Sequence, residues 1–252
     1  MEFIKSKILN QPNLKHAFCL RSGGVSTKPY DSLNCSYYVG DKKRNVKKNQ
    51  ELVLKRLNFQ RSFFVKQIHS NKVVCAEDHF DKNTEIEADA IICKSFNLAI
   101  SVTTADCAPL LLLDRKKMII GAAHAGWKGA VKGITDNLIE HFQMNGSLLE
   151  NIAVAIGPCI GKNSFEVKSD MINACIKEDS LSEKFFINKS NNDFFDLGRY
   201  LVKKLKNKGL KLIDYIDEDT YKHPGKFFSY RRETKINQPT TGRMINLIGI
   251  TK

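Results

Sequence analysis

Residues 103–114, with the sequence TTADCAPLLLLD, place an acid and a thiol side by side in front of a run of aliphatic residues. Further along the chain, the segment MIIGAAH ends on His124. A thiolate and an imidazole together suit a zinc or copper ion, and they can also act as a nucleophile and its base. A cysteine before an apolar run can equally be a small buried hydrophobic residue. The neighbours of Cys107 must therefore decide its role.

The segments APLLLLD and MIIGAAH are predicted to be the two arms of a β-hairpin, joined by the short polar stretch RKK. With a two-residue turn, Asp114 pairs with Lys117, and Cys107 falls opposite His124 on the same face. A three-residue turn instead puts Cys107 and His124 on opposite faces, unless a bulge restores them. The predicted hairpin therefore supports a pairing of Cys107 with His124, but the sequence does not decide between the two registers.

A third ligand is needed, because a catalytic zinc commonly keeps three protein ligands and one open position. His69 ends the segment FFVKQIH just before a polar turn, where a strand can present a ligand. His141 lies within a predicted helix and His79 lies among polar residues, and these surroundings favour structural or solvated roles. Spacing alone does not assign the third ligand to His69.

Several arginines and glycines could contact an anionic substrate. Bidentate arginine side chains can hold phosphate, although arginines beside turns can also be solvated at the surface. The arginines are Arg21 in LRSGG, Arg231 and Arg232 in FFSYRR, and Arg243 in TTGRM. The glycine-rich segments HAGWKG and GPCIG stand at strand ends, and backbone amides at the start of a helix after HAGWKG could face an anion.

A mixture of helices and strands must position these residues. Strands are predicted at residues 3–9, on both sides of a polar turn at 70–72, and at 88–94, 98–107, 151–158, 210–216, 227–232 and 243–250. Helices are predicted at residues 43–57, 129–144, 171–178 and 194–209, and residues 16–34 are expected to be mostly loop. The clearest helix is 129–144, which has an apolar stripe and ends before Gly146.

The strands occur mostly in pairs, with helices between them. This order predicts an α+β fold with a mixed, largely antiparallel sheet system. No repeat, low-complexity tract or proline-rich linker interrupts the 252 residues, so we expect a single domain spanning residues 1–252.

Composition narrows the class of protein. Hydrophobic residues make up 42% and charged residues 27%, as in a soluble globular protein. The apolar runs are too short for a membrane span and the N-terminus lacks a secretory segment, so a cytoplasmic protein that does not bind membranes is expected. The net charge is +13, but the lysines are scattered rather than gathered with aromatic residues, which argues against nucleic-acid binding. The seven cysteines form no CxxC pair and are expected to be reduced.

A set of motifs resembles one known family along nearly the whole chain. The segments are LRSGGVSTKPYDSLN, VKQIHSN, ADAIIC, TTADCAPLLLLD, AAHAGWKGAVKGI, AIGPCIGKNSFEV and FFSYRRE followed by TGRMINLI. In this order they resemble the YfiH/YlmD family, also called the laccase-domain or multicopper polyphenol oxidase family. The resemblance implies a YfiH-like, β-sandwich-like core with flanking helices.

The resemblance also implies a metal site and an activity. It implies one zinc bound by His69, Cys107 and His124, with copper as the alternative metal. The implied substrates are purine nucleosides and phosphate: phosphorolysis of adenosine, inosine and methylthioadenosine to the free base and (methylthio)ribose 1-phosphate, and hydrolytic deamination of adenosine to inosine. The oligomeric state is left open.

Roles can be proposed for individual residues on this basis. Besides Cys107, the predicted catalytic residues are Asp106, as a proton shuttle or as support for a ligand, and Arg21, as the main phosphate contact. Glu166 is a second candidate carboxylate. The predicted substrate-binding residues are Arg21, Gly126, Lys128, Arg231, Arg232 and Arg243.

The chain departs from the family pattern at two places. Lys128 stands where the family usually has arginine, which keeps the charge and loses the planar fork. Asp219 and Thr220 stand where a Cys-Thr pair is frequent. Neither change touches the predicted metal ligands.

Three other functions compete with the nucleoside enzyme. A copper-dependent, laccase-like polyphenol oxidase would need a trinuclear cluster held mostly by histidines, and six histidines are too few. A metal-free hydrolase would use Cys107 as nucleophile and His124 as base. A basic RNA-binding module would need the aromatic and basic interleaving that this chain lacks.

Overall fold

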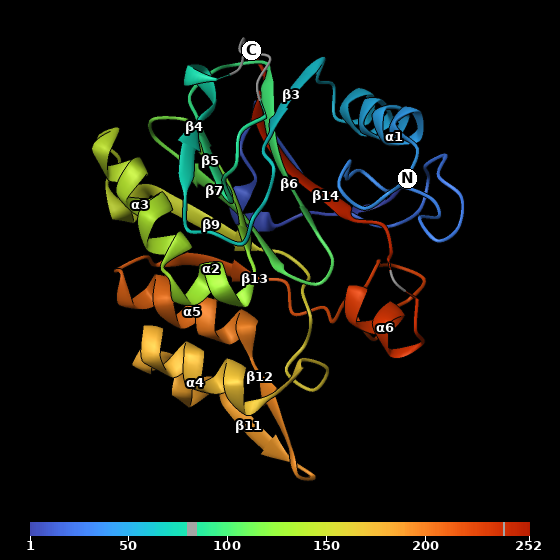
Figure 1. Cartoon of the computed structure of the whole chain (residues 1–252). Coiled ribbons are helices and arrows are strands. Elements are labelled where there is room, and N and C mark those ends of the chain that lie inside the picture. Colours follow the sequence, from blue (N-terminus) through green and yellow to red (C-terminus); the bar gives the residue numbers. More distant parts are fainter. Residues whose placement is uncertain (80–84, 239) are drawn as a thin grey trace.

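A six-stranded sheet carries the predicted hairpin at its centre. In the computed structural model, which describes residues 1–79, 85–238 and 240–252, the sheet has the order β13-β9-β7-β8-β5-β4 (Figure 1). Its strands are β4 (Val73–Cys75), β5 (Ala90–Cys93), β7 (Ala108–Asp114), β8 (Ile119–Ala125), β9 (Ile152–Ile156) and β13 (Leu212–Tyr215). Every residue of β7 and β8 is buried, because both faces of this sheet are covered. Coverage on both sides explains the unbroken aliphatic run of β7.

A five-stranded sheet covers one face of the first. Its order is β1-β2-β14-β6-β3, and its strands are β1 (Phe3–Ile4), β2 (Leu14–Cys19), β3 (Arg61–Phe64), β6 (Leu98–Thr104) and β14 (Met244–Ile250). Ile100 and Ile248 of this sheet share a buried cluster with Leu111 and Ile120 of the other sheet. The two sheets therefore pack face to face as a sandwich.

Helices close both outer faces. Figure 1 shows α1 (Lys43–Arg56) on the side of the five-stranded sheet and α3 (Ile134–Met144) with α5 (Leu197–Asn207) on the other side. Val53 of α1 packs with Ala99 and Leu247, whereas Leu138 and Leu201 pack with Leu110.

The remaining elements are short. They are α2 (Trp127–Val131), α4 (Ser169–Glu178), α6 (Tyr230–Lys235), a three-stranded sheet of β10 (Glu166–Val167), β12 (Asn192–Phe195) and β11 (Phe186–Lys189), and the 3₁₀ helices η1 (Lys7–Leu9), η2 (Ala76–Asp78), η3 (Leu149–Asn151) and η4 (Ser180–Phe185).

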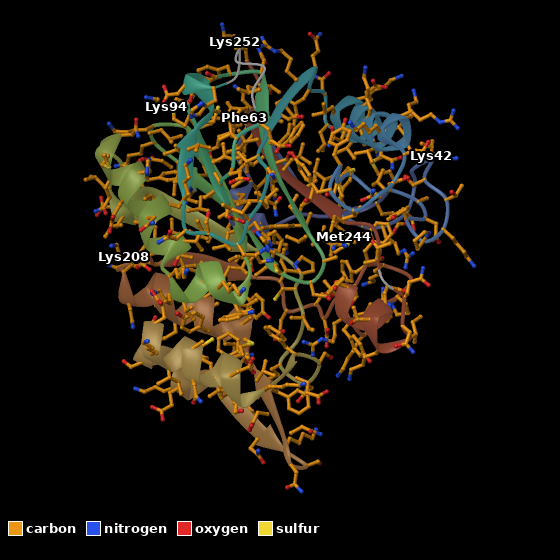
Figure 2. All side chains as sticks on the ribbon, viewed as in Figure 1. Lys42, Phe63, Lys94, Lys208, Met244 and Lys252 are labelled. Carbon is orange, nitrogen blue, oxygen red and sulfur yellow. The ribbon has the colours of Figure 1, made fainter. Side chains whose placement is uncertain are left out.

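The predicted fold class is confirmed. Among the described strands, β3–β6, β4–β5 and β9–β13 pair in parallel, and the other pairs are antiparallel. The result is an α+β fold with a largely antiparallel, sandwich-like core and flanking helices. Figure 2 shows Lys42, Lys94, Lys208 and Lys252 at the periphery on different sides of the molecule, which agrees with the scattered positive charge. None of the helices in the described part of the chain has the length and apolar character needed to cross a membrane.

The hairpin itself differs from both predicted registers. Asp114 pairs with Ile119 and Pro109 with His124, so residues 115–118 form the connection. The connection is longer than expected because the Asp114 side chain accepts hydrogen bonds from the backbone N–H of Lys116 and Lys117. A four-residue connection shifts the strand pairing by two residues relative to a two-residue turn, so each side chain stays on the same face. Continued past β7, the register puts Cys107 opposite Gly126 and on the same face as His124.

The helix predicted at residues 129–144 is in fact two helices. Gly133 has a φ of 86°, in the left-handed region, and separates α2 from α3. The apolar stripe predicted the packed face correctly, but not the change of direction that a glycine permits.

The strand predicted at residues 227–232 is also wrong. Phe227 and Phe228 are buried in a loop, and α6 begins after Ser229, whose hydroxyl accepts a hydrogen bond from the backbone N–H of Arg232. This serine cap favours a helix over the strand that the aromatic residues suggested.

Several predicted boundaries are wrong as well. The strand predicted at residues 98–107 ends at Thr104, and the strand expected to end at His69 stops at Phe64. The strand predicted at residues 3–9 ends at Ile4 and is followed by η1, and β2 includes His16–Cys19, which were assigned to a loop. The helix predicted from residue 194 begins at Leu197, because Asp196 caps it and Phe194 and Phe195 belong to β12.

Candidate metal centre and adjoining pocket

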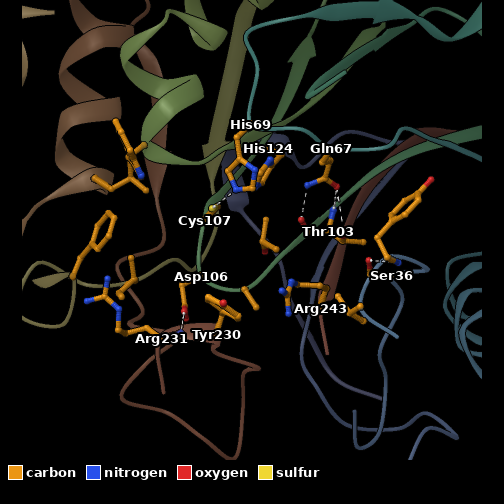
Figure 3. A pocket seen from close by; sticks show the side chains of 18 residues that line it. Ser36, Gln67, His69, Thr103, Asp106, Cys107, His124, Tyr230, Arg231 and Arg243 are labelled. Atoms are coloured by element: carbon orange, nitrogen blue, oxygen red, sulfur yellow. Dashed lines mark hydrogen bonds between the residues drawn. The ribbon is translucent and has the colours of Figure 1, made fainter. Parts of the chain in front are cut away.

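Three donor side chains from separate parts of the chain meet at one end of the central hairpin. The ligand atoms of His69, Cys107 and His124 all lie within 4.8 Å of one another (Figure 3). His69 comes from the loop between β3 and β4, Cys107 directly precedes β7, and His124 is in β8. The Sγ of Cys107 is 3.8 Å from Nε2 of His69. Sequence reasoning named these three residues, and the structure brings them together.

The electrostatics favour a thiolate at this position. Burial by itself raises the pKa of Cys107, but the imidazoles of His124 and His69 lower it to about 6. Burial lowers the pKa of His124, whereas the Cys107 thiolate and the Asp89 carboxylate raise it. Thiolate is the form of cysteine that binds metals and attacks electrophiles. Two imidazoles and a thiolate at this spacing form a donor set that fits a single zinc or copper ion.

Gly126 leaves the space that the side chains of His69 and Cys107 occupy. A Cβ atom on Gly126 would lie 2.7 Å from Cδ2 of His69 and 3.0 Å from Sγ of Cys107. The φ of Gly126 is −72°, so backbone conformation does not require a glycine there. Sequence reasoning placed Gly126 among the substrate contacts, and the structure places it directly against two of the three donor side chains, His69 and Cys107.

Asp89 is a site residue that sequence reasoning missed. It is fully buried, and one of its oxygens is 2.8 Å from Nδ1 of His124. In the sequence it stands between two alanines just before the apolar run of β5. The available sequence signal was a single acid directly before a buried strand. Such a carboxylate needs hydrogen-bond or charge partners, so it points to a polar site nearby.

A pocket of about 510 Å³ opens beside the three donors. Ser36, Gln67 and Thr103 lie on one side of it in Figure 3, and Asp106, Tyr230 and Arg231 on another. Its aromatic lining residues are Tyr38, Trp127, Phe165 and Tyr230. The volume lies in the usual range for small-molecule sites, and the mixture of apolar walls with a few polar groups is typical of them.

Two of the four predicted arginines line this pocket. Arg243 packs over the Tyr230 ring at 5.6 Å, and its Nη1 donates to the carbonyls of Thr241 and Gly242. The other guanidinium nitrogens of Arg243 have no acceptor within the described residues. Arg231 lies over the Phe165 ring at 5.5 Å and is also held by a carbonyl oxygen.

Arg21 and Arg232 are not brought to this pocket. The Arg21 guanidinium donates to the carbonyl oxygens of Asp31 and Pro224 and packs on the Phe228 ring. The guanidinium of Arg232 donates to three carbonyl oxygens, those of Thr220, Tyr221 and Phe227. In this structure both side chains hold loops together.

Lys128 and Glu166 also lie outside the pocket lining. Lys128 is exposed on α2 and packs over the Trp127 ring at 5.6 Å. The Glu166 carboxylate lies 3.4 Å from Lys235, and its backbone carbonyl accepts the bond from Arg231. The arrangement favours Asp106 over Glu166 as the carboxyl group that can reach a ligand.

Asp106 lines the pocket and is almost fully buried. Its two oxygens accept hydrogen bonds from the Thr220 hydroxyl at 2.6 Å and from the backbone N–H of Arg231 at 2.8 Å. Burial raises the pKa of Asp106, and these hydrogen bonds oppose the shift. Asp106 therefore ties the Asp219–Thr220 segment and the start of α6 to the bend that carries Cys107.

The sandwich core, with a His-Cys-His group at the wall of a pocket, defines a laccase-domain protein of the YfiH type. The chain belongs to the family described as multi-copper polyphenol oxidoreductase laccase, whose sequence profile matches residues 15–251. The family resemblance of the motifs is thereby confirmed.

Relatives and solved structures match over nearly the full length. Purine nucleoside phosphorylase RC0672 of Rickettsia conorii is 34% identical over 238 residues, which cover 91% of this chain and 98% of the relative. Purine nucleoside phosphorylase YfiH of Escherichia coli is 33% identical over 231 residues, 90% of each chain. The crystal structure of Neisseria meningitidis protein NMB0706 has a TM-score of 0.89 and 31% identity and covers 99% of both chains. The chain is similar to these proteins in fold and sequence.

Proposed function

We propose that this chain is a zinc-dependent purine nucleoside phosphorylase that acts on adenosine, inosine and methylthioadenosine and also deaminates adenosine to inosine. The names of its relatives support an enzyme of the phosphorylase kind. The observation that carries the proposal is the position of His69, Cys107 and His124 at the wall of a pocket of about 510 Å³. This volume can hold a nucleoside.

The pocket offers surfaces for a purine base. Trp127, Phe165 and Tyr230 contribute aromatic rings to its lining. Bases stack on aromatic side chains with a gain of about 1–3 kcal/mol per base, with little dependence on which base it is. Such stacking is consistent with several purine nucleosides as substrates.

Phosphorolysis requires a phosphate next to C1′ of the sugar, and we assign its binding to Arg243. A phosphate oxygen forms a bond to C1′ as the bond from C1′ to the purine nitrogen breaks. The base leaves with the electron pair, and the proton of hydrogen phosphate ends on the base. The guanidinium nitrogens of Arg243 that lack a protein acceptor in the described residues can bind the dianion. Arg243 replaces Arg21 as the main phosphate contact in this proposal.

His69, Cys107 and His124 would hold the zinc ion. When bound with an open coordination position, zinc acts as a Lewis acid and lowers the pKa of water. In deamination, water adds to C6 of adenosine and ammonia leaves, so a proton must pass from the water to the amine. Asp106 is the one carboxyl group among the described lining residues, and we assign the proton transfer to it. Burial raises the pKa of this carboxyl group.

Polyphenol oxidation with copper is the alternative that the family description suggests. Imidazole and thiolate also suit copper. Within the described parts of the chain, His69, Cys107 and His124 form the only group of three or more His, Cys, Asp or Glu residues that could hold a metal ion. A multicopper oxidase needs a second, multinuclear copper cluster, so a single group favours the nucleoside activity.

A metal-free hydrolase is the second alternative. The pKa of Cys107, lowered to about 6, suits a nucleophile as well as a ligand, and His124 could act as its base. This alternative uses the same residues and differs in its need for metal.

The experiment measures metal and products together. The protein is purified without added metal, its zinc and copper are quantified, and it is incubated with adenosine with and without phosphate. Adenine and ribose 1-phosphate that form only with phosphate support phosphorolysis, and inosine without phosphate supports deamination. Full activity after complete metal removal would contradict the zinc requirement. Oxygen uptake with a phenol in place of nucleoside turnover would favour the oxidase.

A further inference from the structure

Asp89 lies beside two of the three donors without being one of them. It directly precedes β5, and its carbonyl oxygen accepts a hydrogen bond from the backbone N–H of His124 in β8 at 2.8 Å. Its side chain is 0% exposed. A buried carboxylate is costly unless it is paired and hydrogen-bonded, so its partners indicate its role.

The carboxylate of Asp89 binds the ring of His124. One oxygen is 2.8 Å from Nδ1 of His124. With Nδ1 bearing the proton toward a carboxylate, the remaining ring nitrogen, Nε2, has its lone pair available for a metal. Asp89 therefore selects the tautomer and the orientation of this imidazole.

The same carboxylate also holds the loop that carries His69. It accepts hydrogen bonds from the backbone N–H groups of Ile68 at 3.2 Å, His69 at 3.0 Å and Ser70 at 2.6 Å, and from the Ser70 hydroxyl at 2.7 Å. His69 has a φ of 59°, in the left-handed region that non-glycine residues seldom adopt. Convergent N–H donors on one carboxylate stabilise this conformation.

The other side of the loop is fixed by helices. The side chain of Asn71 donates to the carbonyl oxygen of Lys132, and the side chain of Asn137 donates to the carbonyl oxygen of Asn71. A Cβ on Gly129 would lie 2.6 Å from the Ser70 carbonyl oxygen, so α2 packs directly on the loop. The position of His69 thus depends on the buried Asp89 carboxylate on one side of the loop and on α2 and α3 on the other side.

We propose that Asp89 is a positioning residue of the metal centre, which fixes the Nδ1–H tautomer of His124 and the backbone of His69 at once. One buried carboxylate thereby holds the imidazole ring of His124 and the backbone that carries His69. This inference rests on the proposed zinc site. Replacement of groups that hydrogen-bond to metal ligands typically lowers metal affinity by about 10–100-fold.

The test compares Asp89→Asn with Asp114→Asn. Asp114 is a matched control, because it is also buried and accepts backbone N–H bonds, but it lies at the other end of β7 from Cys107. Zinc affinity is measured by competition with a chromophoric chelator. We expect Asp89→Asn to lose about 10–100-fold in affinity and Asp114→Asn to stay within about twofold of the wild type. Equal affinities of Asp89→Asn and the wild type would overturn the proposal.

A second measurement uses the wild-type protein and therefore does not depend on whether a variant folds. In the zinc-loaded wild-type protein, long-range ¹H–¹⁵N spectra report which ring nitrogen of each histidine carries the proton. We expect His124 to keep its proton on Nδ1, and a proton on Nε2 instead would overturn the proposal. Should the wild-type protein bind no zinc, the proposed function fails, whereas zinc binding that is indifferent to Asp89 contradicts the positioning role alone.

Discussion

Gly126 and Cys107 lie opposite each other where the register of β7 and β8 is continued, and a Cβ on Gly126 would lie 3.0 Å from Sγ of Cys107. The same Cβ would also crowd the ring of His69. The GAAHAG segment thus supplies one of the three donor side chains, His124, and, two residues later, a glycine that leaves space for the other two, His69 and Cys107.

Replacement of Gly126 by alanine should therefore affect metal binding more than folding. The methyl group must displace His69 or Cys107 by some tenths of an ångström, and we expect at least about tenfold weaker zinc binding. Gly225→Ala is the control, because nothing lies within 4 Å of the equivalent Cβ. Zinc titration of both variants checks this expectation, and unchanged zinc affinity of Gly126→Ala would show that the ligands tolerate the displacement.

Replacement of Cys107 separates the zinc enzyme from the thiol hydrolase. We expect Cys107→Ala to abolish both zinc retention and turnover, because two imidazoles alone bind zinc weakly. Cys75→Ala, a change at a half-buried thiol outside the pocket, should retain both. A Cys107→Ala protein that keeps zinc but loses turnover would instead support Cys107 as a nucleophile.

The Glu77 carboxylate should make the stability of the fold fall in acid. Its carboxylate accepts hydrogen bonds from the backbone N–H groups of Lys94 at 2.6 Å and Ser95 at 2.8 Å. Burial alone raises the pKa of Glu77, but hydrogen bonds to the carboxylate, including one from Cys75, lower it from 4.5 to about 2. Because the folded-state pKa lies below the unfolded one, the carboxylate stabilises the fold above pH 4.5, and this contribution is lost as the pH falls toward 2.

Glu77→Gln should accordingly have a lower urea midpoint than the wild type at pH 7, and the difference should shrink as the pH falls below about 4.5. Urea unfolding at several pH values gives the measurement. A difference that is independent of pH would indicate that the carboxylate charge contributes nothing.

The fold class could be predicted from the sequence because it depends on local patterns. The predicted hairpin also allowed Cys107 and His124 to be neighbours, whereas His69 was assigned only through the family resemblance. Buried strands have apolar runs, and the parity of a hairpin register keeps Cys107 and His124 on one face even though the connection is longer than either expected length. The break at Gly133 and the helix after Ser229 depend on one backbone angle and one cap, which periodicity does not detect.

The contacts of Asp89 and of the arginines could not be predicted from local patterns. The partners of Asp89 lie about 20 and 35 residues away in the chain, and only the tertiary fold brings them together. Arg21 and Arg243 both stand beside glycine turns, but carbonyl oxygens occupy the guanidinium of Arg21, whereas Arg243 faces the pocket.

Replacements of Arg243 and Arg21 should have different effects on phosphate binding. Arg243→Gln should raise the KM for phosphate by about 10–100-fold, because each charge-assisted hydrogen bond contributes about 1.5–3 kcal/mol, while bound zinc should be unchanged. Arg21→Gln should lower thermal stability, since it removes bonds to the carbonyl oxygens of Asp31 and Pro224, and should leave that KM within about twofold. Steady-state kinetics with varied phosphate measures both variants. The reverse result would return the phosphate contact to Arg21, as the sequence alone suggested.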